Sequence, residues 1–105
     1  MPTIKTKHYK DNAGETTKAV QVTEKNLIGL GNWTVGVVVI DVNKKGEEKN
    51  HRIRVHTPKG VRVAGVGDYI VRGDTRLKTF YVVRKDDFEE RWTEIGPYGT
   101  RKGLK

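Results

Sequence analysis

The segment from Arg52 to Val63 constrains this chain most, because basic and β-branched residues alternate on both sides of a turn over 57–60. Successive side chains of a strand point to opposite faces, so the segment predicts a β-hairpin with two unlike faces. The expected core face holds four residues: Ile53, Val55, Val61 and Val63. The expected outer face holds Arg52, Arg54, His56 and Arg62, with Lys59 in the turn. A row of positive charge on a rigid sheet is suited to bind a polyanion.

The register of this hairpin depends on the length of its turn. The sequence Thr57-Pro58-Lys59-Gly60 favours a three-residue loop with a glycine bulge, which pairs Val55 with Val63. A two-residue loop would instead put Val55 opposite Arg62 and mix core with solvent. We therefore expect the bulged turn, with His56 facing Arg62.

Composition fits one small, highly charged domain. The chain has 105 residues, of which 34% are apolar and 32% charged, with a net charge of +8. Such a basic chain favours acidic partners, nucleic acid first and an anionic membrane surface second. The alternative is that the charge only confers solubility and that the arginines form an ordinary solvated face. Cysteine is absent, which excludes disulfides and cysteine nucleophiles.

The sequence also bears on localisation. The N-terminal residues lack the apolar core of a signal peptide. The longest apolar run, 37–40, is too short to cross a bilayer. We therefore expect a soluble protein of the cytoplasm, with no membrane contact.

Alternating and apolar runs predict a mainly β domain with one or two short helices. We expect a single small curved antiparallel sheet or a partly open barrel. The domain should span 1–95, with 1–17 forming an arm or an edge strand and 96–105 a flexible basic tail. Strands are expected over 17–23, 35–42, 49–57, 61–64, 69–72, 79–84 and 92–95. Short helices are expected over 24–30, capped by Thr23, and from Asp86 onward.

Few residues suggest chemistry. The only histidines are His8, His51 and His56, and the last two have opposite parity on one strand, so no metal site is expected. The carboxylate pairs at 86–87 and 89–90 are explained by a helix start. No nucleophile elbow or phosphate loop is present. We therefore expect a non-enzymatic protein without cofactor or metal.

The aromatic residues divide between core and surface. The large rings are expected mostly inside, because apolar residues are scarce; these are Trp33, Phe80, Phe88 and Trp92. Tyr9 and Tyr98 lie in basic flanks and are the better candidates for stacking on nucleic-acid bases. The rings considered for stacking are Tyr9, Trp33, Tyr69, Phe80, Tyr81, Trp92 and Tyr98.

Residues 67–73, GDYIVRG, followed by Phe80-Tyr81, Asp86, Phe88-Glu89 and Trp92, carry a resemblance. They are similar to the C-terminal pattern of a small protein type of bacteriophage and prophage genomes, roughly PGDWIIKG, a gap, then FYPCKPDIFEATYE. The chain departs from that pattern at Val66, Val83 and Lys85, and the loop after Gly73 is longer. The resemblance implies a phage accessory protein of the host cytoplasm, with virion association left open, and no particular activity.

Two functions follow as expectations. The first is nucleic-acid contact through the basic face of Arg52, Arg54, His56, Lys59 and Arg62. The second is a phage protein that engages a host or virion protein, for example by adding a strand to a sheet edge. Exposed edges would also allow two copies of the chain to pair as a homodimer.

Overall fold

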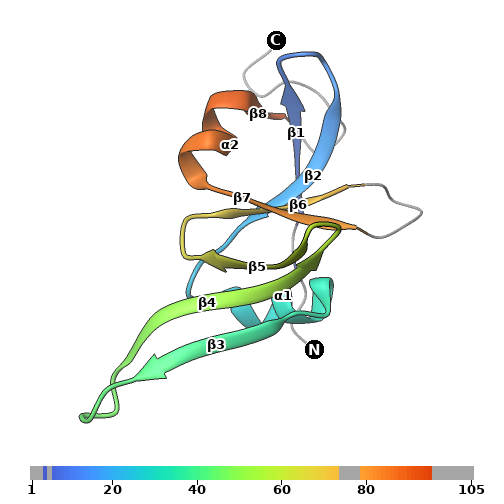
Figure 1. Ribbon diagram of the computed structural model, residues 1–105. Coiled ribbons are helices and arrows are strands. Elements are labelled where there is room, and N and C mark those ends of the chain that lie inside the picture. Colours follow the sequence, from blue (N-terminus) through green and yellow to red (C-terminus); the bar gives the residue numbers. More distant parts are fainter. Residues whose placement is uncertain (1–3, 5, 74–78, 96–105) are drawn as a thin grey trace.

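The computed structural model describes residues 4, 6–73 and 79–95. These residues form a mainly β fold with two short helices, which confirms the expected class (Figure 1). In chain order the elements are β1 (Lys7–Asp11), β2 (Thr16–Gln21), α1 (Leu27–Thr34), β3 (Val37–Val42), β4 (Glu48–Thr57), β5 (Gly60–Gly65), β6 (Tyr69–Arg72), β7 (Phe80–Val83), α2 (Lys85–Arg91) and β8 (Trp92–Ile95). The expected basic tail over 96–105 lies outside the described residues.

The strands divide into two antiparallel sheets, of order β7-β6-β2-β1-β8 and β3-β4-β5, and neither is closed into a barrel. The chain changes sheets at the turn after β5. There Gly67, at φ +99°, donates its N–H to the carbonyl of Val22, and Val22 donates in return to Asp68. This turn is thereby tied to the end of β2, so β6 pairs with β2 and not with β5. The structure therefore has two sheets where we expected one continuous curved sheet or a partly open barrel.

The larger core lies between the two sheets and α1. Its most buried side chains include Ile53 and Val55 of β4, Ile70 of β6 and Leu30 of α1, none of which is exposed to solvent. Phe80 of β7 completes it and meets Trp33 edge-to-face, with ring centroids 4.9 Å apart. The crossing of β4 over β7 therefore holds the sheets together.

A second, aromatic core lies on the opposite face of the five-stranded sheet, beneath α2 (Figure 1). Phe88 of α2 stacks on Tyr69 and on Trp92, with centroids 3.9 and 4.9 Å away, and meets Tyr9 edge-to-face. Tyr9 is 6% exposed, so it is a core residue and not the expected stacking platform. Its strand, β1, pairs on one side with β2 and on the other with β8, and is neither an arm nor an edge.

The β4–β5 hairpin contradicts the expected register. Thr57 pairs with Gly60 across a two-residue loop, so Val55 faces Arg62 and His56 faces Val61. On β5 the core takes Ala64, which is fully buried opposite Ile53. Val61 and Val63, expected in the core, are instead 41% and 53% exposed. Ala64 fills the inner position of this edge strand, and Val61 and Val63 lie on the outer side of the hairpin.

Three further elements differ from expectation. β3 begins at Val37, because Val35 ends α1 in the left-handed conformation at φ 54°. It lies at one end of the three-stranded sheet, so it is an edge strand and not the expected central strand. α1 begins at Leu27, because the side chain of Asn26 binds back to Thr23 and Gln21 and forms a turn over the preceding residues.

In α2 the helix begins one residue earlier than expected, at Lys85. Asp86 does not cap it. Asp86 and Asp87 lie in its first turn, where negative charge favours the helix dipole.

Two valines distinguish the observed register from the expected one. We expect Val55→Ala to lower the free energy of unfolding by roughly 2–3 kcal/mol, because it removes two buried methyl groups and leaves a cavity. Val63→Ala, on the exposed face, should change it by less than about 0.5 kcal/mol. Urea denaturation measures both. Equal losses in the two variants would contradict the register described above.

The buried tyrosines make the free energy of unfolding depend on pH in the alkaline range. Burial raises the pKa of Tyr9 to about 12, and burial with the hydrogen bond to Glu89 raises the pKa of Tyr69. The unfolded chain loses these protons near pH 10, so stability is full below that pH and falls as pH rises toward 12. We expect urea denaturation to show a smaller fall for Tyr9→Phe than for the natural chain. An identical fall in both proteins would show that Tyr9 does not contribute.

Candidate nucleic-acid interface

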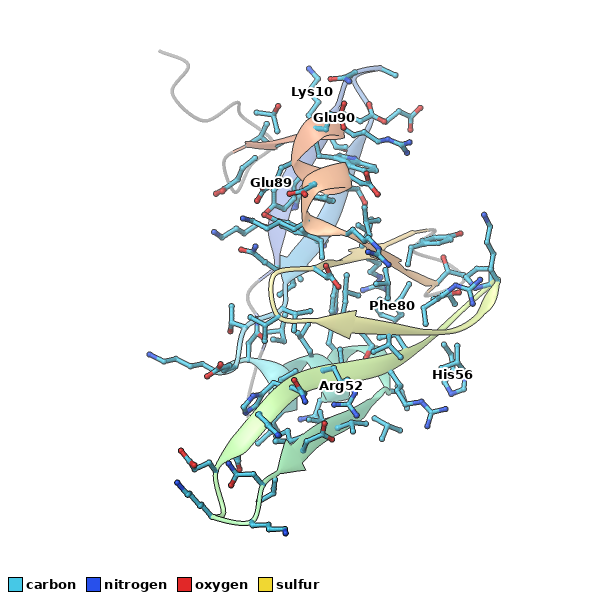
Figure 2. The ribbon with its side chains drawn as sticks, turned by 60° about the vertical axis from the view of Figure 1, so that its left-hand side comes forward. Lys10, Arg52, His56, Phe80, Glu89 and Glu90 are labelled. Carbon is cyan, nitrogen blue, oxygen red and sulfur yellow. The ribbon has the colours of Figure 1, made fainter. Side chains whose placement is uncertain are left out.

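The outer face of β4 carries three of the five expected binding residues. Arg52, Arg54 and His56 alternate with the buried Ile53 and Val55, so they share one side of the strand. Figure 2 shows Arg52 and His56 projecting from β4, at a distance from the acidic Glu89 and Glu90 on α2. The parity predicted from the sequence is confirmed for this strand.

Arg52 is already engaged. Its guanidinium donates to the carbonyl of Asn50 at 2.7 Å and to Asp41 Oδ1 at 3.3 Å. Asn50, at φ 56°, donates its side-chain amide to the other Asp41 oxygen. This arrangement neutralises much of the charge of Arg52 and leaves it a weak candidate for phosphate binding.

Arg54 and His56 are exposed, but apolar residues surround them. Arg54 stands directly opposite Val37 on β3 and Val63 on β5, and His56 stands opposite Val61. All three valines are more than 40% exposed. The outer face is thus a mixed apolar and cationic surface, not a continuous basic row.

Arg62 and Lys59 lie elsewhere. Arg62 shares the inner side of the hairpin with Val55, so it does not join Arg54 and His56 as expected. Lys59 and Arg62 line a cleft of about 570 Å3 together with Arg91, Tyr81 and Trp92. We call this surface the basic cleft; its other lining residues are Thr57, Val71, Val82 and Val83.

The basic cleft combines cations with an accessible ring. None of its lining residues is acidic, and Lys59, Arg62 and Arg91 make no ion pair within the described part of the chain. Tyr81 is 39% exposed. Guanidinium groups donate paired hydrogen bonds to phosphate, and aromatic rings stack on bases. The volume lies within the range of about 300–1,000 Å3 that encloses small ligands.

The sequence placed Tyr81 and Trp92 among the rings considered for base stacking, but it did not associate them, or Arg91, with the hairpin. They come from α2, β7 and β8, and the two-sheet packing brings them to the turn after β4. The alternation along β7 indicated that Tyr81 and Phe80 point to opposite faces, which was the only local signal. The expected contact residue Tyr98 lies outside the described residues.

No group of three or more histidine and acidic residues in the described part of the chain is placed to hold a metal ion. No helix among the described residues is long and apolar enough to cross a membrane.

The contacts of Asp41 can be tested directly. Hydrogen bonds from Asn50, and then from Arg52, hold the pKa of its carboxyl below the usual 3.8. We expect Asn50→Gly, which tolerates the positive φ, and Arg52→Gln each to raise the pKa of Asp41, because each removes a hydrogen bond to the carboxylate. An NMR titration of the carboxyl carbon measures the shift, with Lys44→Gln as the control that leaves it unchanged. No rise in either variant would contradict the network.

The chain matches no protein-family model, no curated protein and no solved structure. Its resemblance to the phage protein type therefore stays a prediction. The basic cleft and the outer face of β4 together hold the five residues expected to bind nucleic acid.

Proposed function

We propose that this protein is a phage-encoded, non-enzymatic binding module that contacts nucleic acid in the host cytoplasm through its basic cleft. The observation that carries the proposal is the joint presence of Lys59, Arg62, Arg91 and the exposed ring of Tyr81 in one cleft without acidic lining residues. This combination is typical of single-strand binding, in which cations follow the backbone and a ring stacks on a base.

The cleft is favoured over the outer face of β4 on electrostatic grounds. On the outer face Arg52 is paired with Asp41, and exposed valines stand on both sides of Arg54. In the cleft three unpaired cations come from two sides, the β4–β5 hairpin and the end of α2. The net charge of +8 would add long-range attraction for a polyanion.

The hairpin offers a matched pair of variants. Arg62→Gln removes one positive charge from the inner face of the β4–β5 hairpin, and Arg54→Gln removes one from its outer face. We expect Arg62→Gln to weaken binding of a labelled oligo(dT) about tenfold, the equivalent of about 1.4 kcal/mol, and to lower the salt slope by about 0.7. Arg54→Gln should do neither. Fluorescence anisotropy over a series of salt concentrations measures both quantities.

Stacking is tested separately through Tyr81. Tyr81→Leu should weaken oligo(dT) binding by about 1–3 kcal/mol without changing the salt slope, because it removes a ring and no charge. Equal effects of Arg54→Gln and Arg62→Gln would place binding outside the cleft. Absence of binding by the natural chain at low salt would overturn the proposal.

The second candidate is a protein partner from the host or the virion. It is favoured by the outer face, where Val37, Val61 and Val63 are exposed around Arg54. Arginine is enriched at protein interfaces, and an exposed apolar patch is typical of an interaction site. Capture of one partner that withstands high salt and is lost in Val63→Asp would favour this function over nucleic-acid contact.

A further inference from the structure

A second set of basic side chains crosses the five-stranded sheet, away from the basic cleft. His8 of β1 pairs with Lys18 of β2, and Lys18 pairs with Arg72 of β6. Directly opposed residues of neighbouring strands share one face, with strands about 4.7–4.9 Å apart. His8, Lys18 and Arg72 therefore form a transverse line on one face, which we call the cationic row.

The cationic row is electrostatically unbalanced. Lys18 and Arg72 stand directly opposite each other, and like charges in that position destabilise a sheet. The described strand positions that share this face hold no acidic residue, since Glu94 and Asp11 belong to the other face. None of the three makes an ion pair within the described part of the chain.

Arg72 adds an independent observation. Its Nε is buried and has no hydrogen-bond partner among the described residues. A buried donor without a partner costs free energy, so its presence needs a reason. An anion placed beside the guanidinium would offset the like charges of Arg72 and Lys18, which stand directly opposite each other.

The cationic row lines a cavity that is large enough for one small anion. His8, Lys18 and Arg72, with Thr16, Thr17 and Gly73, surround about 200 Å3. This is below the range of about 300–1,000 Å3 that encloses drug-sized ligands, and suits a small ion or a single group of a larger ligand. Thr17 Oγ donates to the carbonyl of Arg72 at 2.9 Å and so fixes β2 against the end of β6.

We propose that the cationic row is a binding site for one phosphoryl group. A phosphate carries a charge of about −1.5 to −2 and three strong acceptor oxygens, which match three donors arriving from three strands better than the two oxygens of a carboxylate. The group is supplied either as free phosphate or as part of a nucleic-acid backbone. The site lies on the opposite face of the five-stranded sheet from Tyr81 and does not depend on the proposed function of the basic cleft.

The test uses Lys18, which is exposed, so its replacement spares the core. Inorganic phosphate is added to the isotope-labelled full chain at constant ionic strength, and side-chain NMR signals of His8, Lys18 and Arg72 are followed. We expect saturable shifts, and we expect Lys18→Gln to raise the phosphate Kd at least about tenfold, the equivalent of about 1.4 kcal/mol. The matched control is Lys25→Gln, which replaces another exposed lysine before α1 and should leave the Kd unchanged.

Two results would overturn the site: no saturable shift at the cationic row in the natural chain, or an unchanged Kd in Lys18→Gln. Oligo(dT) added in place of phosphate distinguishes the sources. Shifts at the row with both ligands assign a backbone phosphate, and shifts with phosphate alone assign a free anion; either supports the site. Arg62→Gln should retain phosphate binding at the row, so failure of the basic cleft and failure of this site are separable.

Discussion

The burial of Ile53 and Val55 on β4 is the interaction on which the arrangement of charge depends. Each such side chain contributes about 1.5–3 kcal/mol when fully removed from water. An exposed ion pair contributes at most about 1 kcal/mol, so the apolar residues decide which way the strand faces. Arg54 and His56 project outward because the alternate positions are buried. The ion pair between Asp41 and Arg52 is a consequence of this orientation and not its cause.

The five-stranded sheet separates charge and apolar surface in a different way. One face is covered by α2, whose Phe88 packs among Tyr9, Tyr69 and Trp92 and whose exposed side carries acidic residues. The other face is apolar where β4 crosses it and cationic at the row of His8, Lys18 and Arg72. The strands of this sheet therefore contribute to both cores. The row of His8, Lys18 and Arg72 stays uncovered, because no other described element packs over that part of the face.

The sequence predicted most strands because local alternation and turn residues mark them: β6 and β8 have the expected bounds. It failed where the position of a strand in its sheet, or the neighbours of a side chain, depended on contacts between residues far apart in the sequence. The apolar run from Val35 to Val42 indicated a central strand, yet its first residues close α1 and the rest forms an edge. Arg91 and Tyr81 could not be assigned to a site with Lys59, because only the meeting of two sheets brings them together.

The turn over 57–60 links the two candidate surfaces. The hydroxyl of Thr57 donates to the carbonyl of Gly60 at 2.7 Å and accepts from the N–H of Lys59 at 3.2 Å, which stabilises the two-residue loop. A loop one residue longer would shift β5 by one position and exchange its faces. Arg62 would then join Arg54 on the outer face, and Val63 would replace it beside Tyr81. The length of one turn therefore decides whether the cleft is basic and whether the outer face is apolar.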